Sequence, residues 1–375
     1  MTPLVIDVRS AQDARDVVHR AVQSLAEGKL VCFPTETVYG IAASALDEEA
    51  VERLLTVKRR HRKQALSLAV KSADAALDYV PRLEPLGRRL ARRCWPGPVT
   101  LVLRNNDPDS LIRQLPPKVQ QSVVPANMIG LRVPAHRLIL EVLRLMPGPL
   151  TLTSANRSGR PDPVTAQDVV KALQTDVDLV LDDGRCQFAQ PSSVVQVQDN
   201  QLQVLRAGVV SEATLQRLAS LIVLFICTGN TCRSPMAELI CRNVLSEQMK
   251  CRLDQLEDRG VIVMSAGVAA TAGGGATPEA VQVLADRGLD LSAHITQPLN
   301  DRLVRHADLI FTMTQAHRQA VVGHWPDAAE RTYLLCGEHV DVADPIGGPR
   351  ELYRSCADQI EAAIRRRIVE FGVAG

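Results

Sequence analysis

The sequence predicts two consecutive α/β domains. Its 375 residues are more than one hydrophobic core usually serves. Short apolar segments of the kind that form buried strands alternate with stretches whose apolar residues recur at helical spacing. This alternation is interrupted by a polar segment at 211–220 and then starts again. We therefore expect one domain over residues 1–210 and a second over 221–375, with the boundary near residue 215.

Helical periodicity predicts two helices in the first part of the chain. Residues 10–28 carry apolar side chains at helical spacing, between Ser10 as the N-cap and Gly28 at the C-terminal end. Residues 48–60 form the second helical stretch, which ends in a basic run. Short apolar segments predict strands at 30–33, 66–70, 99–103, 131–133 and 177–181.

A hairpin and a new strand are expected on either side of the polar segment. Residues 194–197 and 201–205 alternate between apolar and polar side chains around Asp199-Asn200, a pair that favours a tight turn. Residues 221–226 are strongly apolar and predict the first strand of the second domain.

The composition is that of an ordinary globular protein and excludes several classes. Charged residues make up 23% of the chain and hydrophobic residues 46%, which argues against wholesale disorder. The longest apolar run, 221–227, is far shorter than the ~20 residues of a membrane span. The N-terminus shows no secretory signal. Nine scattered cysteines fit free thiols in a reducing compartment. We expect a cytoplasmic protein with no membrane association.

Charge is distributed unevenly between the two halves. Residues 1–210 contain 27 Lys and Arg against 22 Asp and Glu, a balance of +5, and the remaining residues contain 16 against 20, a balance of −4. Such asymmetry indicates separate functions, and the basic half is the better candidate for binding polyanions.

The segment 227–238, CTGNTCRSPMAE, carries the strongest chemical signal. It follows the apolar strand and precedes an amphipathic helix, with Ser234 and Pro235 suited to the helix start. The loop is therefore expected at a helix N-terminus, where backbone N–H groups and the helix dipole attract anions. Gly229 permits tight curvature, and Asn230 can adopt a left-handed conformation and brace the loop.

Two residues of this loop are suited to phosphoryl transfer. Cys227 and Arg233 are six positions apart, so a loop closed around a phosphate can hold the thiol below it and the guanidinium beside it. Arginine binds two phosphoryl oxygens through its planar fork, and the positive field favours the thiolate nucleophile. The other residues expected to bind the phosphate are Thr228, Gly229, Asn230, Thr231, Cys232 and Ser234.

On these motifs the second half, from about 221 to 375, resembles the low-molecular-weight protein tyrosine phosphatases. Further matching segments are Ser265-Ala266-Gly267, the run DLIFTMT at 308–314 and Asp344-Pro345-Ile346-Gly347-Gly348. The resemblance implies a Rossmann-like parallel sheet flanked by helices, and Cys227 as the nucleophile that forms a cysteinyl-phosphate. It also implies Asp344 as general acid, because the leaving atom must be protonated.

Within that family the loop is most similar to that of the protein arginine phosphatases. Thr231 stands where tyrosine-specific members more often have a bulkier aliphatic residue, and Ile346 stands where arginine phosphatases have Phe. Protein-bound phosphoarginine and phosphotyrosine are therefore both candidate substrates. The family also suggests that Cys232 protects Cys227 in a reversible disulfide, with a passive loop thiol as the alternative.

Arsenate reductases share this loop and are the rival enzyme class. They need further cysteines that relay a disulfide, and no relay motif surrounds Cys336 or Cys356. Retention of Asp344 without such a relay favours a phosphatase. A third alternative is a thiol redox sensor in which Cys227 and Cys232 form the switch.

Several short segments of the first half offer hydroxyl, amide and cationic side chains. They read PTETVYG at 34–40, KRR at 58–60, WPGPVT at 95–100, GLRVPAH at 130–136, TSANRSGRP at 153–161, PSSVV at 191–195 and LRAG at 205–208. Lys58 and Arg60 can neutralise phosphates, and Ser154 and Asn156 offer directional hydrogen bonds. Such groups at strand ends bind polar ligands in a crevice. The sequence contains no Walker loop and no Cys/His cluster of zinc-site spacing.

In this order the segments resemble the YrdC/Sua5 family, the L-threonylcarbamoyladenylate synthases, over roughly residues 10–210. The residues that match the family's motifs, and that the resemblance assigns to ATP and threonine binding, are Thr35, Lys58, Arg60, Arg132, Ser154, Asn156, Ser192 and Arg206. The resemblance implies a twisted mixed sheet with helices. It also implies a reaction in which a carbamate made from L-threonine and bicarbonate attacks the α-phosphorus of ATP and pyrophosphate leaves. The product supplies the t6A modification of tRNA.

The resemblance further implies Mg²⁺ bound to ATP, no tightly bound cofactor and no metal site in the protein. His61 departs from the proline usual after the Lys-x-Arg motif, and Gln196 departs from a usual Asp. A competing hypothesis makes the first half a non-catalytic RNA-binding module that holds tRNA through its phosphates. Retention of the Lys-x-Arg and Ser-x-Asn motifs favours the enzyme, with tRNA and the threonylcarbamoyl-transfer machinery as further candidate partners.

Overall fold

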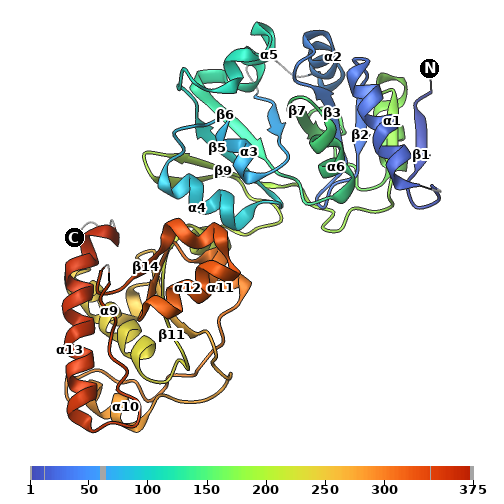
Figure 1. Cartoon of the computed structure of the whole chain (residues 1–375). Coiled ribbons are helices and arrows are strands. Elements are labelled where there is room, and N and C mark those ends of the chain that lie inside the picture. The colour runs from blue at the N-terminus through green and yellow to red at the C-terminus, as the bar shows by residue number, and fades with distance from the viewer. Residues whose placement is uncertain (1, 12, 60–64, 338, 372–375) are drawn as a thin grey trace. The chain divides into compact units, whose positions relative to one another are not determined.

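The computed structural model describes residues 2–11, 13–59, 65–337 and 339–371. The chain divides into two compact units, Met1–Leu218 and Ala219–Gly375, and each is described by itself (Figure 1). Arg60 and His61, both singled out in the sequence, lie outside the described residues. None of the described helices is both long and apolar enough to cross a membrane.

The first unit is built on a ten-stranded sheet. Its elements, with α8 at the boundary, are β1 (Leu4–Asp7), α1 (Ala14–Ala26), β2 (Val31–Phe33), β3 (Gly40–Ser44), α2 (Glu48–Lys58), β4 (Ser67–Ala69), α3 (Ala73–Leu77), α4 (Pro85–Cys94), β5 (Val99–Arg104), η1 (Leu111–Gln114), α5 (Pro117–Val123), η2 (Pro125–Asn127), β6 (Met128–Arg132), α6 (Arg137–Leu145), β7 (Leu150–Ser154), α7 (Ala166–Leu173), η3 (Gln174–Asp176), β8 (Leu179–Asp182), β9 (Ser193–Gln198), β10 (Gln201–Arg206) and α8 (Glu212–Ala219).

The strands of this sheet follow the order β1-β8-β2-β3-β7-β4-β6-β5-β9-β10. Strand β2 pairs with β8 in parallel and with β3 in the antiparallel direction. Strand β5 likewise pairs in parallel with β9 and antiparallel with β6. The sheet is therefore mixed, which confirms the fold class expected for the first half.

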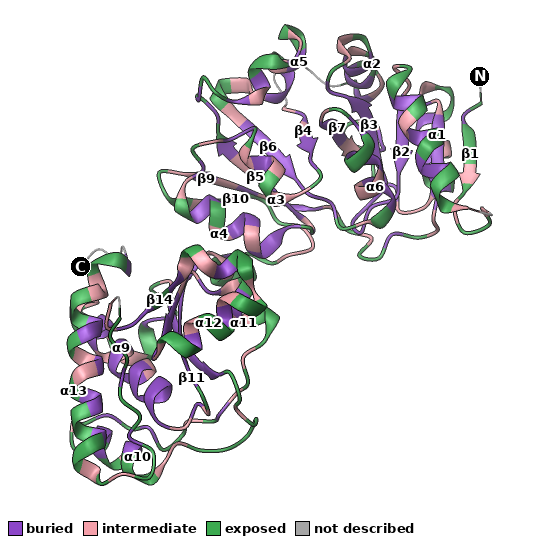
Figure 2. Cartoon of the chain, in the orientation of Figure 1, coloured by how far each residue is buried: buried purple, intermediate pink, exposed green. Residues whose placement is uncertain are grey.

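Helices α1 and α6 contribute apolar side chains to the core of this unit. Val18 and Leu25 of α1 join Ile139 and Val142 of α6 in one buried cluster, which also includes Val31 of β2. Burying such a side chain fully is worth about 1.5–3 kcal/mol, so this packing outweighs local propensity. Figure 2 shows the strands as largely buried, whereas the helices combine buried and exposed faces.

The five strands predicted for the first half are present as β2, β4, β5, β6 and β8, with ends shifted by a few residues. The sequence patterns did not predict β1, β3 or β7. The clearest reason is seen in β3, which reads GIAAS: glycine and alanine have low strand propensity. This segment is a strand because it is buried between β2 and β7 and pairs with both.

Two helix ends differ from those expected. The N-cap of α1 is Asp13 rather than Ser10: the Asp13 side chain accepts a hydrogen bond of 2.8 Å from the Arg15 backbone N–H. An N-cap must directly precede the first helical residue, and Ser10 lies too far upstream. Helix α2 ends at Lys58 because Arg59 adopts a left-handed conformation with φ of 49°.

The predicted hairpin is confirmed as β9 and β10. Asp199 and Asn200 have φ values of 53° and 56°, as a tight turn with two left-handed residues requires. The Glu84 carboxylate accepts hydrogen bonds from both backbone N–H groups, at 3.2 Å from Asp199 and 2.5 Å from Asn200.

The second unit contains a four-stranded sheet of order β12-β11-β13-β14, in which every neighbouring pair is parallel. This confirms the Rossmann-like parallel sheet. Its elements are β11 (Leu221–Cys227), α9 (Arg233–Met249), η4 (Leu253–Gln255), β12 (Val261–Gly267), α10 (Pro278–Ala285), α11 (Asp301–His306), β13 (Leu309–Thr312), α12 (Gln315–His324), η5 (Pro326–Arg331), β14 (Thr332–Leu334), α13 (Arg350–Arg367) and η6 (Ile368–Phe371).

Alternate residues of β11 face two different apolar clusters. Val223, Phe225 and Cys227 belong to a cluster that includes residues of α9 and α13. Leu224 and Ile226 belong to the cluster on the other side, with residues of α11 and α12. Since side chains alternate along a strand, helices on both faces of the sheet explain why all seven residues of β11 are buried.

Candidate active sites

The loop after β11 lies where the strand order of the second unit reverses. Strand β11 is flanked by β12 on one side and β13 on the other, and such a switch point leaves a crevice at the carboxyl ends of the strands. Helix α9 begins at Arg233, which corrects the expected start at Ser234 and Pro235. The loop therefore meets the N-terminus of a 17-residue helix, whose backbone N–H groups suit an anion.

Asn230 holds the loop in shape. It is fully buried in the left-handed conformation, with φ of 56°. Its side-chain nitrogen donates to the hydroxyls of Ser234 and Ser265, each at 2.9 Å. Its side-chain oxygen accepts from the Gln297 backbone N–H at 2.9 Å. His294 Nε2 lies 2.8 Å from the Asn230 carbonyl oxygen. Three of these partners come from distant parts of the chain, so the sequence pattern around the loop could not identify them.

Cys227 lies buried at the base of the loop. Its Sγ atom accepts a hydrogen bond from the Asn230 backbone N–H at 3.3 Å and lies 3.0 Å from Ser234 Oγ. Asn230 thus supports the loop around the sulfur in two ways. Its backbone N–H bonds to Cys227 Sγ, and its side chain bonds to Ser234, whose hydroxyl lies beside that sulfur. Cys232 is also buried, and its Sγ lies 3.5 Å from Thr277 Oγ1 and 3.7 Å from the Tyr353 hydroxyl. All nine cysteines are free thiols; the disulfide between Cys227 and Cys232 stays a prediction.

Arg233 and Asp344 are in contact although they are 111 residues apart. The Arg233 side chain is 6% exposed, donates to the Val342 carbonyl oxygen at 3.3 Å and forms an ion pair with Asp344. The Asp344 side chain is 45% exposed and also accepts from the Ile346 backbone N–H. The structure therefore places the carboxylate beside the guanidinium at the edge of the loop that carries Cys227.

His317 is a neighbour of this loop that the sequence patterns did not single out. Its Nε2 atom lies 2.9 Å from Thr228 Oγ1. Burial, and next the positive charge of the nearby Arg233 guanidinium, lower the pKa of His317 to about 4. The signal available in the sequence was weak: Thr314, three positions earlier, is suited to an N-cap, and it is the N-cap of α12.

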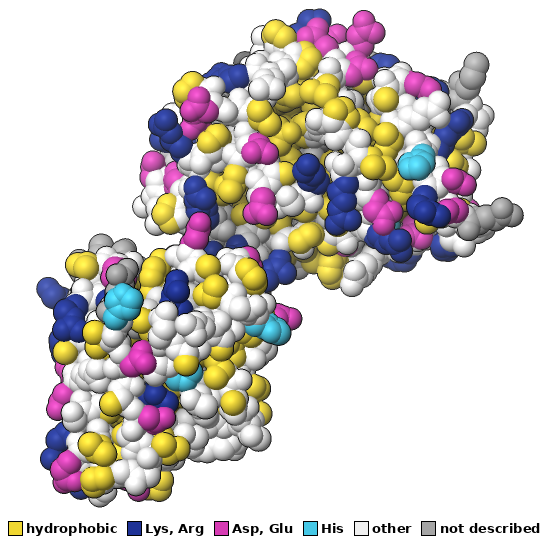
Figure 3. Space-filling model, viewed as in Figure 1, with side chains coloured by type: hydrophobic (Ala, Val, Ile, Leu, Met, Phe, Trp, Pro, Cys, Tyr) yellow, Lys and Arg dark blue, Asp and Glu magenta, His cyan; other side chains and the backbone are white. Residues whose placement is uncertain are grey.

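A cavity of about 670 Å³ in the first unit gathers most of the residues expected there. This size lies within the usual range for small-molecule sites, which is about 300–1,000 Å³. The expected residues that line it are Thr35, Lys58, Arg132, Ser154, Asn156, Ser192 and Arg206. Arg60 cannot be placed, because it lies outside the described residues. In Figure 3 hydrophobic side chains gather over the middle of this unit's face, with Lys and Arg side chains beside them.

Lys58 is a buried ammonium group at the end of α2. Its Nζ atom donates to the Ser154 carbonyl oxygen at 2.6 Å and to Asn156 Oδ1 at 2.7 Å, and Ser154 Oγ lies at 3.4 Å. Asn156 in turn accepts from the Ser154 hydroxyl at 2.6 Å. The two predicted motifs thus meet in one cluster. The oxygens solvate the ammonium group, and its positive charge is retained in the wall of the cavity.

Arg132 is engaged by the protein itself. Its Nη2 atom forms a buried ion pair with Glu36 at 2.6 Å and donates to Thr37 Oγ1 at 2.9 Å. Glu36 also accepts from the Ala135 backbone N–H at 2.9 Å. These contacts connect the segment that contains Thr35 to the end of β6. This geometry gives Arg132 a part in shaping the cavity wall, and its contact with a substrate stays a prediction.

Ser192 and Arg206 form a second pair at the cavity. Arg206 Nη2 donates to the Ser192 carbonyl oxygen at 2.7 Å and to its hydroxyl at 3.0 Å. Burial lowers the pKa of Arg206, and the negative charge of Asp162 acts in the opposite direction. Asp162 was not among the expected residues, although it follows the predicted motif at 153–161 directly. It is the sole carboxylate among the described residues that line this cavity, against four Lys or Arg side chains.

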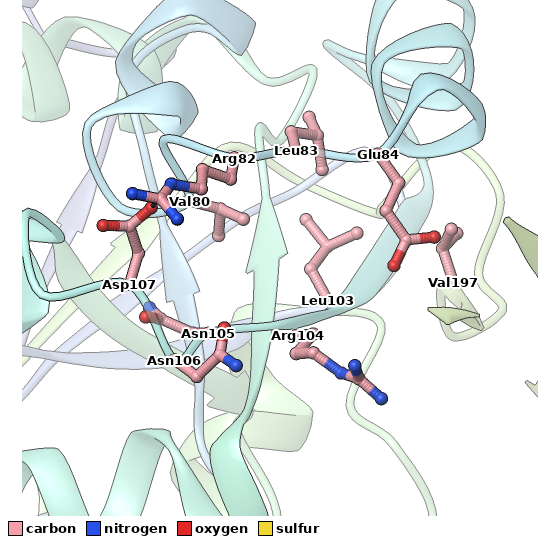
Figure 4. Close-up of a pocket in the computed structure, with 10 residues that line it drawn as sticks. All are labelled: Val80, Arg82, Leu83, Glu84, Leu103, Arg104, Asn105, Asn106, Asp107 and Val197. Atoms are coloured by element: carbon pink, nitrogen blue, oxygen red, sulfur yellow. Dashed lines mark ion pairs between the residues drawn. The ribbon is translucent and has the colours of Figure 1, made fainter. Parts of the chain in front are cut away.

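A second cavity in the same unit is far smaller than the first. It has a volume of about 60 Å³ and lies between Arg82, Glu84, Asn105 and Asp107 (Figure 4). Arg82 Nε lies 3.0 Å from the buried Asp107 Oδ2 in an ion pair. Within the described parts of the chain, no group of three or more His, Cys, Asp or Glu side chains is arranged to hold a metal ion.

Comparison with known proteins assigns each unit to a family. The Sua5/YciO/YrdC family model, described as "Telomere recombination", matches residues 23–208. The model for "Low molecular weight phosphotyrosine protein phosphatase" matches residues 222–370. A Methanocaldococcus jannaschii protein, provisionally named as a threonylcarbamoyl-AMP synthase, is 30% identical over 210 residues, which are 56% of this chain and 92% of that protein. A Bacillus subtilis protein-arginine-phosphatase is 36% identical over 148 residues, 38% of this chain and 92% of that protein.

The chain belongs to both families. Its Sua5/YrdC unit also matches the longer Pyrococcus abyssi threonylcarbamoyl-AMP synthase, with 34% identity over 182 residues, 48% of this chain and 51% of that protein. A solved structure of a Pyrococcus abyssi Sua5 variant aligns with a TM-score of 0.51 at 21% identity, over 88% of this chain and 97% of that one. This last likeness concerns the fold alone.

Two glycines allow a matched test of the sites. A Cβ atom on Gly267 would lie 2.4 Å from the Thr228 carbonyl oxygen and 2.9 Å from the Asn230 nitrogen. Gly267→Ala must therefore displace the loop at 227–233, which is the predicted phosphate loop. A Cβ on Gly208 would lie 2.3 Å from the Pro191 carbonyl oxygen, next to Ser192. We expect each substitution to lower the activity of its own unit at least tenfold and to destabilise that unit by about 1–3 kcal/mol.

The measurements are aryl phosphate hydrolysis, threonine-dependent pyrophosphate release and thermal unfolding. Gly275→Ala is the control, because no atom outside Gly275 and its two chain neighbours lies within 4 Å of its added Cβ. If Gly267→Ala hydrolyses the aryl phosphate as fast as Gly275→Ala does, the prediction is wrong, and the close approach of β12 to the phosphate loop is not required for activity.

Proposed function

We propose that the chain is a bifunctional enzyme. Its Sua5/YrdC unit forms L-threonylcarbamoyl-AMP from L-threonine, bicarbonate and ATP for the t6A modification of tRNA. Its phosphatase-family unit hydrolyses protein phosphoresidues, with phosphoarginine preferred to phosphotyrosine. The assembly of Cys227, Arg233 and Asp344 on one loop and its edge carries the second activity, and the Lys58 cluster in the large cavity carries the first.

In the Sua5/YrdC unit, catalysis consists mainly of positioning and charge stabilisation. The buried Lys58 ammonium group, together with Arg60, stabilises the negative charge of the phosphates. The threonine carbamate oxygen forms a bond to the α-phosphorus, and the bond to the leaving pyrophosphate breaks. Mg²⁺ enters as part of the Mg–ATP substrate, because Mg²⁺ in such sites is coordinated mainly by substrate phosphates and water. The cavity is large enough for a nucleotide beside an amino acid.

In the phosphatase unit, the Cys227 thiolate attacks phosphorus and forms a cysteinyl-phosphate. Arg233 and the loop N–H groups stabilise the phosphoryl oxygens. The departing nitrogen or oxygen takes the bonding electron pair and receives a proton from Asp344. Water then forms a bond to the phosphorus of the cysteinyl-phosphate and transfers a proton to Asp344, which restores the acid. The S–P bond breaks, its electron pair returns to Cys227 as the thiolate, and phosphate leaves.

The properties of two further cysteines weigh against an arsenate reductase. Burial raises the pKa of the Cys356 thiol to about 12, and burial also raises the pKa of Cys336. A disulfide relay needs thiolates that attack readily near neutral pH.

The nine free thiols of the chain fit the reducing cytoplasm, which we propose as the location of the protein.

We expect the two activities to be separable. Cys227→Ser removes the nucleophile, so it abolishes phosphatase turnover and leaves adenylate formation intact. Lys58→Ala combined with Arg60→Ala removes two positive charges from the first unit and has the opposite effect. The measurements are phosphate release from a phosphorylated substrate and formation of threonylcarbamoyl-AMP, identified by mass. Loss of both activities from either change in a folded protein contradicts this prediction.

That assay also separates the enzyme from an RNA-binding module. Pyrophosphate release by the wild-type protein should depend strictly on both threonine and bicarbonate. If ATP is not consumed while tRNA still binds, the first unit is a binding module.

Asp344→Asn tests proton donation. The amide keeps the size of the side chain but donates no proton to the leaving group. A well-placed general acid contributes about 10²–10⁴ in rate, so we expect a loss of that size in kcat for substrates with poor leaving groups. An activated aryl phosphate needs no proton and should lose little. Equal losses on both substrates indicate that Asp344 acts in binding, through its ion pair with Arg233.

Thr231→Ile tests the choice of phosphoresidue. A guanidine next to phosphorus favours a hydroxyl or a small neighbour, whereas a tyrosine ring favours apolar walls, and the Thr231 side chain is half-buried in the loop. We expect the unmodified protein to have a higher kcat/KM for phosphoarginine. Thr231→Ile should shift the preference toward phosphotyrosine. A wild-type preference for phosphotyrosine that Thr231→Ile leaves unchanged assigns the unit to the tyrosine phosphatases.

A further inference from the structure

His317 connects helix α12 to the phosphate loop. Its Nε2 atom lies 2.9 Å from Thr228 Oγ1, and its Nδ1 atom lies 2.9 Å from Thr314 Oγ1. The histidine is buried, with 6% exposed, whereas Thr228, the residue directly after the nucleophile, is exposed. A buried imidazole thus contacts a hydroxyl at the mouth of the site.

The hydrogen bonds around Thr314 determine which imidazole nitrogen carries the proton. The His317 backbone N–H donates to Thr314 Oγ1 at 3.2 Å, because Thr314 is the N-cap of α12. A hydroxyl has one hydrogen to donate, and the acceptor within its reach is His317 Nδ1. In a neutral imidazole that accepts at Nδ1, the proton is on Nε2. His317 therefore donates to Thr228 Oγ1.

This assignment leaves the Thr228 hydroxyl hydrogen available. Its oxygen accepts from His317, so its own O–H points away from the imidazole. Within the described parts of the chain, no other hydrogen bond to this hydroxyl is formed. The opposite tautomer would take the Thr228 hydrogen and leave the Thr314 hydrogen without an acceptor. The first arrangement leaves the free hydrogen on the exposed Thr228 hydroxyl rather than on the half-buried Thr314 hydroxyl, and it places a hydrogen-bond donor on the residue next to Cys227.

The charges that face His317 keep it in the neutral form at physiological pH. Burial and the positive charge of Arg233 lower the pKa of His317 to about 4. The negative charges of Asp344 and Asp341 act in the opposite direction and are outweighed. Between about pH 5 and 8 the Nδ1 atom is therefore an acceptor, and the direction of the hydrogen bonds does not change.

We propose that His317 is a positioning residue of the phosphatase site, which orients the Thr228 hydroxyl so that its O–H donates to an oxygen of the phosphoryl group. The inference rests on the proposed phosphatase function and deepens it. A donor fixed before the reaction stabilises the charge that develops on phosphoryl oxygens without a cost of reorientation. The Thr228 side chain is exposed to solvent, so we expect its effect to be about tenfold, below the 10²–10³ of a buried oxyanion donor.

The test uses two matched pairs of variants in the full chain. Thr228→Val removes the hydroxyl at nearly constant shape, and Thr228→Ser keeps it. His317→Asn retains a polar group near the Nδ1 position only, whereas the longer His317→Gln can place an N–H donor near the Nε2 position. We expect Thr228→Val and His317→Asn each to lower kcat about tenfold and to weaken inhibition by orthovanadate by a similar factor. Thr228→Ser and His317→Gln should recover most of each loss.

Two measurements separate this role from a structural one. If His317 acts through Thr228, the double variant His317→Asn with Thr228→Val loses no more activity than Thr228→Val alone, whereas independent structural damage multiplies. Spectra of the protein labelled with ¹⁵N-histidine, with His317 assigned from His317→Gln, should show a neutral imidazole protonated at Nε2 at pH 6.

The inference is overturned if Thr228→Val keeps the wild-type kcat and vanadate affinity, or if His317 is protonated at Nδ1. A wild-type protein that hydrolyses no phosphate ester contradicts the proposed function instead. In that case the tautomer and the vanadate affinity of the Thr228 variants, measured by calorimetry, still decide the inference.

Discussion

The conformation of the phosphate loop depends on the hydrogen bonds of the Asn230 side-chain amide. A left-handed residue with a side chain is unfavourable unless its surroundings compensate, and Asn230 does so with hydrogen bonds from both ends of its amide. These bonds connect the loop to β12 and to the segment before α11, which are far away in the sequence. They fix the backbone conformation of the loop, in which the Asn230 backbone N–H donates to Cys227 Sγ. In the proposed mechanism, this preorganised loop surrounds the Cys227 nucleophile.

In the first unit, the Lys58 cluster stabilises a buried polar group as well, but that group is charged. An ammonium group loses much solvation on burial, and here a carbonyl, an amide and a hydroxyl oxygen replace water. These oxygens solvate the ammonium group, and none of them carries a formal charge. Lys58 lines the cavity together with Arg206, and the carboxylate of Asp162 acts on the charge of Arg206 in the opposite direction to burial. The cavity is consequently suited to an anionic ligand that also carries a positive group.

The sequence predicted well those features that depend on neighbours along the chain. The alternation around Asp199-Asn200 predicted the hairpin, and the apolar run at 221–226 predicted β11, because both signals are local. Strand β3 was not predicted because its sequence, GIAAS, has little strand preference. The segment forms a strand because it pairs with β2 and β7. His317 and Asp162 were not predicted either, because neither belongs to a motif. The contact of His317 with Thr228, and the cavity that Asp162 lines, exist only in the folded chain. Arg132 was recognisable as important, but its ion pair with Glu36 was not.

Cys227 is the last residue of the central strand β11, and it pairs in register with Gly267 of β12. Its side chain faces the same cluster as Val223 and Phe225 because the intervals between them are even numbers of residues. Insertion or deletion of one residue within β11 would turn the sulfur to the opposite face and bring a different residue against Gly267. Natural variation in this strand should therefore consist of substitutions at constant length. Changes in length should collect in the connections instead.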